Sequence, residues 1–101
     1  MTPVDRRIDL HGLTQTVAHG RLLRFLEDAH ANGARIVLVI TGKGNDTPRD
    51  IGEPSRGVLR RAVPEWLKSA AFKPFVAGVS EAGRRHGGAG AFYVRVRRRR
   101  G

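Results

Sequence analysis

Residues 7–40 constrain the fold of this chain most, because they read as a strand, a helix and a second strand in succession. Between the two strand-like stretches, apolar residues recur at helical spacing, at Ala18, Leu22, Phe25, Leu26 and Ala29. Asn32-Gly33 is suited to end this helix, and the aliphatic run 35–40 lacks alternation, which is typical of a central strand covered on both faces. A crossover of this kind places the carboxyl ends of both strands at the same edge of a sheet.

A second helix is predicted by the apolar spacing from Val58 to Leu67. Ser55 precedes it and is a residue type that caps helices, whereas Pro64 lacks a backbone N–H and should kink or split the helix near its end. His19 and His30 lie in the first helix; we expect both to face solvent and assign them no role.

Two further strands are predicted at 75–79 and 91–97. In the second of them, the apolar residues Phe92, Val94 and Val96 alternate with Tyr93, Arg95 and Arg97. One side of that strand should therefore be apolar and the other cationic.

The charge of the 101 residues is concentrated in the second half of what should be a single domain. Residues 1–50 carry seven Lys or Arg against six Asp or Glu, whereas residues 51–101 carry twelve against three. A formal net charge of +10 distributed in this way favours a polyanionic partner such as nucleic acid.

The composition also argues against several classes of protein. There is no cysteine, so neither a disulfide framework nor thiolate chemistry is available. The longest aliphatic run, 36–40, is too short to cross a bilayer. We therefore expect a cytoplasmic protein without a membrane partner.

The candidate catalytic residues are Asp9 and His11, in the stretch Asp9-Leu10-His11-Gly12. Side chains alternate along a strand, so Asp9 and His11 share one face while Ile8 and Leu10 take the other. His11 is suited to act as a general base on water or a ribose hydroxyl, and Asp9 to bind a divalent cation, Mg²⁺ or Mn²⁺.

The alternative interpretation of this pair is structural: Asp9 accepts hydrogen bonds from turn amides and His11 packs at the strand end. No further acidic residues follow at metal-ligand spacing, so a preformed two-metal site is not predicted, and whether any cofactor is needed stays open.

Two glycine-bearing segments follow or precede strands and are candidate phosphate contacts. They are Thr41-Gly42-Lys43-Gly44 and His86-Gly87-Gly88-Ala89-Gly90. Glycines allow backbone N–H groups to approach an anion closely, and Lys43 and His86 add cationic or proton-donating side chains. Neither segment has the spacing of a Walker loop or a dinucleotide fingerprint, so no nucleotide cofactor is expected. Taken alone, the first segment is equally compatible with a tight turn, and a run such as the second is more often only a flexible turn.

Arginines could form a track for phosphates along the second half of the chain. They are Arg56, Arg60, Arg61, Arg84, Arg85, Arg95 and the run 97–100. Tyr93 is the main candidate for stacking on a base, because Trp66 and the four Phe residues are expected in the core. Binding should therefore follow the nucleic-acid backbone more than its sequence.

Taken together, these motifs resemble the Smr (small MutS-related) domain. The matching segments, in order, are Ile8-Asp9-Leu10-His11-Gly12, Thr41-Gly42-Lys43-Gly44, Gly57-Val58-Leu59 leading to Trp66-Leu67, and His86-Gly87-Gly88-Ala89-Gly90-Ala91 leading to Tyr93-Val94. The resemblance covers residues 7–97, and leaves an N-terminal extension at 1–6 and a basic tail at 98–101.

The resemblance implies an α/β fold: a two-layer sandwich of a four-stranded mixed sheet and two main helices, similar to the C-terminal domain of translation initiation factor three. It also implies a nucleic-acid partner and endonuclease activity on DNA or RNA. Asp9 and His11 correspond to the segment implicated in cleavage, and the substrate-contacting glycine segments correspond to Gly42, Lys43, Gly44, Gly87, Gly88 and Gly90.

Three hypotheses of function follow from the sequence. The first is a small Smr-type endonuclease, and the second is a non-catalytic module that binds nucleic acid or the ribosome. The third is an enzyme acting on a small phosphorylated substrate, which accounts for the glycine segments but not for the +9 of residues 51–101.

Overall fold

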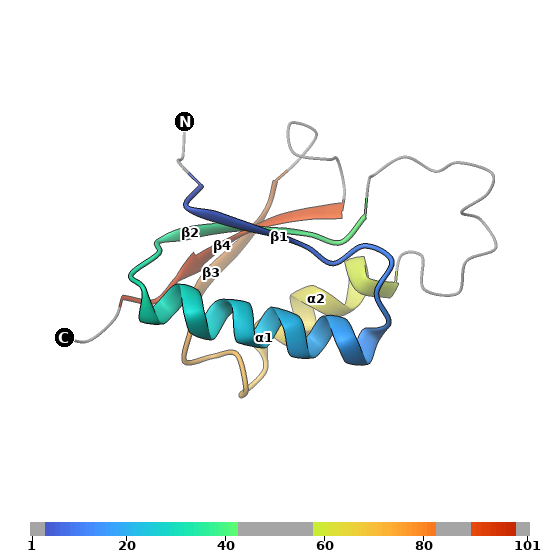
Figure 1. The fold of residues 1–101 in the computed structure, drawn as a ribbon, viewed down its shortest axis with the longest axis horizontal. Helices are drawn as coiled ribbons and strands as arrows, with labels where there is room; N and C mark the ends of the chain where they lie inside the picture. Colours follow the sequence, from blue (N-terminus) through green and yellow to red (C-terminus); the bar gives the residue numbers. More distant parts are fainter. Residues whose placement is uncertain (1–3, 43–57, 83–89, 99–101) are drawn as a thin grey trace.

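The computed structural model describes residues 4–42, 58–82 and 90–98 of the chain, which form two layers. Figure 1 shows a sheet with both helices on one of its sides. Along the sequence the elements are β1 (Arg6–Asp9), α1 (Gln15–Ala31), β2 (Ile36–Ile40), α2 (Val58–Lys68), β3 (Val76–Glu81) and β4 (Ala91–Val96). This is the α/β two-layer fold that the sequence predicted, with a four-stranded mixed sheet and two main helices.

The strands lie in the order β1-β2-β4-β3, so β1 and β3 form the two edges. β1 pairs with β2 in parallel, whereas β4 is antiparallel to both of its neighbours. β1 begins at Arg6, one residue before the predicted strand, and the N–H of Asp5 already donates to the carbonyl of Ile36 over 2.8 Å.

The core lies between the sheet and the helices. Alternate residues of the central strands point into it, such as Val37 and Val39 of β2, and both are fully buried. α1 contributes the predicted positions Ala18, Leu22, Leu26 and Ala29 to the same cluster. α1 is capped at the start by the hydroxyl of Thr14, and Gly33 adopts the positive φ of 77° just beyond its end.

Two details of the helices differ from the sequence predictions. α2 continues through Pro64 to Lys68, so the proline does not split it. His19 and His30 do not face solvent freely: both are half-buried. The ring of His19 meets those of Trp66 and Phe72 edge to face, at centroid distances of 5.0 and 5.1 Å. The helical spacing of apolar residues identified the helices. It could not show that these imidazoles pack against aromatic rings from the second half of the chain.

Neither α1 nor α2 combines the length and the hydropathy that a membrane-spanning helix needs, and this holds for the described parts of the chain.

Candidate active site

The carboxylate of Asp9 and the imidazole of His11 lie in direct contact at the end of β1. Asp9 Oδ1 is 2.7 Å from His11 Nδ1, and the same oxygen accepts the backbone N–H of His11 over 3.0 Å. Both side chains are about half exposed, at 47% and 49%. The pair is therefore preorganised and remains accessible to a ligand.

The alternation of β1 explains why this pair forms. Ile8 and Leu10 pack into the core, and Leu10 is fully buried, so the intervening residues Asp9 and His11 must point to the other side. Gly12 follows with a φ of 80°, a conformation that side-chain-bearing residues rarely adopt, and turns the chain toward α1. The sequence prediction that Asp9 and His11 share one face is confirmed.

The ends of three strands meet beside this pair. In register, Asp9 lies opposite Ile40 of β2, and Ile40 lies opposite Ala91 of β4. Neighbouring strands are about 4.8 Å apart, which places Ala91 about 10 Å from Asp9.

Gly42 and Gly90, one from each glycine segment, lie in contact at the end of these three strands. The N–H and hydroxyl of Thr41 both donate to the carbonyl of Gly90, over 2.6 and 2.8 Å. A Cβ at position 90 would lie 3.1 Å from both the N and the O of Gly42, so a side chain there requires the backbone to shift. The structure thus brings Gly42 and Gly90 together at the same end of the sheet as Asp9 and His11.

Ten of the predicted binding residues lie outside the described part of the chain: Lys43, Gly44, Arg56, Arg84, Arg85, His86, Gly87, Gly88, Arg99 and Arg100. Their proposed roles stay predictions.

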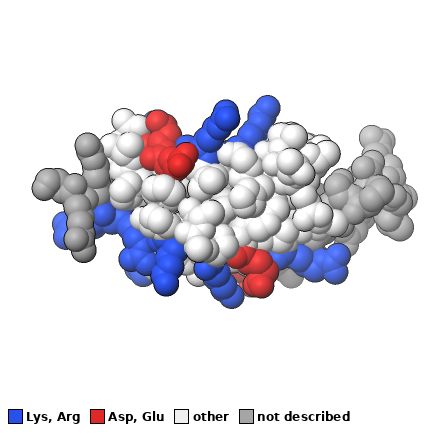
Figure 2. All heavy atoms as spheres, turned by 90° about the horizontal axis from the view of Figure 1, so that it is seen from below, with Lys and Arg blue, Asp and Glu red and all other residues white. Residues whose placement is uncertain are grey.

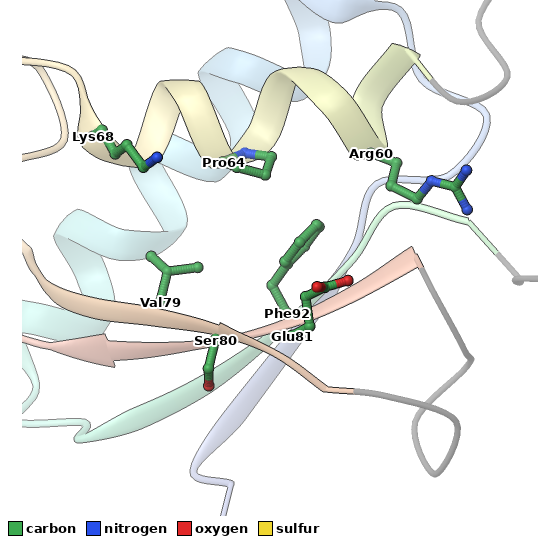
Figure 3. A pocket seen from close by; sticks show the side chains of 7 residues that line it. All are labelled: Arg60, Pro64, Lys68, Val79, Ser80, Glu81 and Phe92. Carbon is green, nitrogen blue, oxygen red and sulfur yellow. The ribbon is translucent and has the colours of Figure 1, made fainter.

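Arg60 lies on α2, on the side of the sheet that the helices cover. It is exposed on α2 and lines a groove of about 660 Å³ between that helix and the edge strand β3. The other lining residues are Pro64, Lys68, Val79, Ser80, Glu81 and Phe92. Figure 3 shows the Arg60 side chain directed away from Lys68, toward the end of the sheet at which β4 begins.

The sequence analysis missed residues at two places: beside Asp9 on β1, and in the groove between α2 and β3. Arg7 precedes Asp9 by two residues on β1 and therefore shares its face, a relation that the same alternation rule could have revealed. Lys68 and Glu81 line the groove, but no local pattern brings α2 beside β3; only the tertiary packing does so.

A metal centre assembled from the protein alone is not seen in the described residues, where no three His, Cys, Asp or Glu side chains cluster. A cation at this site would have Asp9 as its carboxylate ligand and would depend on water or a bound phosphate for its remaining ligands.

The comparisons with known proteins agree with this fold. A family model of the Smr domain matches residues 8–97, which include every element of the fold except the first two residues of β1. This chain belongs to the Smr domain family. The family is known for nucleic-acid binding and nicking.

Two solved Smr proteins resemble the chain over most of its length. The Smr domain of MutS2 from Thermus thermophilus is 29% identical with a TM-score of 0.70, and the match covers 91% of this chain and 98% of that one. YdaL, a stand-alone small MutS-related protein from Escherichia coli, is 33% identical with a TM-score of 0.64, over 91% of this chain and 64% of that one. No curated protein sequence matched the chain.

Proposed function

We propose that this Smr domain is an endonuclease that cleaves or nicks phosphodiester bonds in DNA or RNA, with His11 as the general base. The observation that carries the proposal is the 2.7 Å contact between Asp9 Oδ1 and His11 Nδ1 at an exposed strand end. A side chain that removes a proton in the transition state must be both oriented and accessible, and this pair is both.

Asp9 determines which nitrogen of His11 is available. An ionised carboxylate only accepts hydrogen bonds, so a hydrogen bond to Asp9 requires the proton to lie on Nδ1. The neutral ring then has its lone pair on Nε2, directed away from Asp9.

In the proposed step, Nε2 takes the proton of the attacking oxygen, which belongs to water or to a ribose 2′-hydroxyl. That oxygen forms a bond to phosphorus, the bond to the leaving oxygen breaks, and the leaving oxygen gains a proton from solvent.

The phosphate would bind beside this pair, where Gly42 and Gly90 bring backbone close to the strand ends. A divalent cation, where one takes part, would be held between Asp9 and the phosphate and would neutralise developing negative charge.

The test is a nuclease assay on nicked, branched and single-stranded DNA and RNA, with Mg²⁺, with Mn²⁺ and with a chelator. We expect His11→Ala and Asp9→Asn each to lower the cleavage rate by about 10²- to 10⁴-fold while retaining most of the affinity for the substrate. Glu27→Gln is the matched control for Asp9→Asn, because it makes the same change at an exposed carboxylate on α1.

Two results would contradict the proposal. Unchanged rates in both His11→Ala and Asp9→Asn would remove their assigned roles. A wild-type protein that binds nucleic acid in a salt-dependent manner but cuts none of the substrates would instead support a non-catalytic binding module.

A further inference from the structure

One face of the sheet carries no helix within the described part of the chain (Figure 1), and we term it the open face. Alternation assigns its side chains, because their neighbours point into the core. They are Arg7 and Asp9 of β1, Ile36, Leu38 and Ile40 of β2, Gly78 and Ser80 of β3, and Ala91, Tyr93 and Arg95 of β4.

We propose that the open face is a binding platform for a single strand of nucleic acid, which it guides toward Asp9 and His11. This inference rests on the proposed function, since it names the form of the substrate that reaches the same site. It is carried by three features of the face: an aromatic ring, flanking cations and continuity with the strand ends.

The aromatic ring belongs to Tyr93, in the middle of the face. Its register neighbours are Leu38 on one side and Ser80 on the other, and Arg7 lies beyond Leu38. Leu38 is only 1% exposed, whereas Tyr93 is half-buried. The partly accessible ring of Tyr93 therefore lies beside a buried apolar side chain. Aromatic side chains on the uncovered face of a four-stranded sheet can stack on unpaired bases, and a single ring such as Tyr93 offers a place for one of them.

The cations flank this ring. Arg7 and Arg95 are both exposed, and Arg95 lies two residues from Tyr93 on the same face of β4. A Cβ at Gly78 would lie 3.1 Å from Nη2 and 3.7 Å from both Cζ and Nε of Arg95, so the guanidinium rests against the edge strand where glycine leaves room for it. Two planar groups therefore follow one another along β4, about 7 Å apart.

The face leads directly to the candidate active site. Beyond Tyr93, β4 begins with Ala91, which lies opposite Ile40, which in turn lies opposite Asp9. A strand whose bases contact Arg95 and Tyr93 thus reaches the point where Gly90 touches Gly42, next to the Asp9–His11 pair.

Among the described residues, the opposite surface of the molecule lacks this combination. Figure 2 shows the outer side of the helix layer, where Lys and Arg lie along the margins and the middle is uncharged. A base-paired duplex has its base faces stacked inside, so it can approach Arg7 and Arg95 with its phosphates but cannot stack on Tyr93. The open face should therefore prefer single strands.

The experiment measures binding of a fluorescein-labelled ten-nucleotide single strand and of its duplex by anisotropy, in the His11→Ala background so that neither is cut. We expect Tyr93→Leu to weaken binding of the single strand at least about fivefold and to leave binding of the duplex nearly unchanged. Tyr93→Phe, which keeps the ring, should restore most of the affinity.

The arginines are tested by the salt dependence of single-strand binding. Arg7→Ala and Arg95→Ala should each reduce the slope of log Kd against log salt by about 0.7, as expected for the loss of one phosphate contact. Arg24→Ala removes the same charge from exposed α1 and serves as the control, with a smaller expected change. Gly78→Ala keeps every charge but displaces the guanidinium of Arg95, and should weaken binding modestly.

Folded Tyr93→Leu and Arg7→Ala variants that bind the single strand as tightly as the parent protein would overturn the platform. The platform would also be overturned if its variants lost equal affinity for the single strand and the duplex and Arg24→Ala lost as much. Such a result would indicate unspecific electrostatic attraction. A wild-type protein that cuts no substrate, combined with selective loss in Tyr93→Leu, would overturn the endonuclease and retain the platform. Cleavage with normal binding in all platform variants would overturn the platform alone.

Discussion

The two faces of the sheet differ in what they demand of their side chains. The covered face places Val37, Val39 and Val94 under the helices with no exposed area. The open face carries exposed Arg7 and Asp9 on its edge strand. Both sets come from the same strands by alternation, so residues of one parity face the helices and residues of the other parity face away from them.

β1 and its extension show this division most clearly. Leu10 is fully buried in the core, whereas its neighbours Asp9 and His11 are about half exposed and contact each other. Adjacent residues thus have opposite surroundings, and substitutions at the two kinds of position measure how independent the two faces are.

The largest effect on stability is expected at Leu10. Leu10→Ala should lower the free energy of unfolding by about 2–5 kcal/mol, because it leaves a cavity in the core. His11→Ala, one residue further, should change it by less than about 0.5 kcal/mol, because the imidazole is about half exposed and bonds to the exposed carboxylate of Asp9. Urea denaturation of both variants measures the difference, and similar losses for the two would show that the faces are not independent.

An intermediate effect is expected where backbone meets backbone. Gly90→Ala should lower the free energy of unfolding by about 1–3 kcal/mol. Its Cβ would lie 3.1 Å from the main chain of Gly42, which cannot move aside as a side chain can. Gly78→Ala creates an equally short contact, but with the flexible end of the Arg95 side chain. It should therefore lower the free energy of unfolding much less. Thermal unfolding compares the two variants; a larger loss for Gly78→Ala would contradict the close approach of Gly42 and Gly90.

The smallest effect is expected at Asp5, which precedes β1. The N–H groups of Ile36 and Arg35 donate to its carboxylate, over 3.0 and 2.7 Å, and these bonds hold the pKa of Asp5 below its ordinary value of 3.8. A lowered pKa in the folded state means that the stabilisation is present above about pH 4 and is lost as the pH falls through the folded value.

Asp5→Asn should therefore melt slightly below wild type at pH 7, and the difference should shrink as the pH is lowered below 3.8. Melting temperatures measured between pH 2 and pH 7 provide the test. A difference that stays constant over this range would show that the charge of Asp5 contributes nothing.

Much of the fold follows from local patterns in the sequence. The apolar spacing of α1 and the aliphatic run of β2 identified elements that lie where they were predicted, because periodicity depends only on neighbouring residues. The pairing of Asp9 with His11 was predictable for the same reason, since two residues apart on a strand means one face.

Other features could not be read from local patterns. Arg60 was predicted to contact nucleic acid because it is basic and exposed, and that role stays a prediction; only the tertiary structure shows that it lines a groove between α2 and the edge strand β3. His19 was expected in solvent, but α2 and the segment after it bring Trp66 and Phe72 against its ring. Both outcomes depend on which residues the tertiary packing brings together: His19 and Trp66 are 47 positions apart in the chain, and Arg60 and Glu81 of the groove are 21 apart.

The sequence by itself determined which residues alternate, which recur at helical spacing and therefore which side chains share a face with Asp9. Only the tertiary structure decided the order β1-β2-β4-β3, the contact between Gly42 and Gly90, and the placement of both described helices on the face opposite the one that carries Tyr93. The physical reason is that alternation follows from the local geometry of the backbone. Strand order instead reflects which long-range pairing buries the most apolar surface under the two helices.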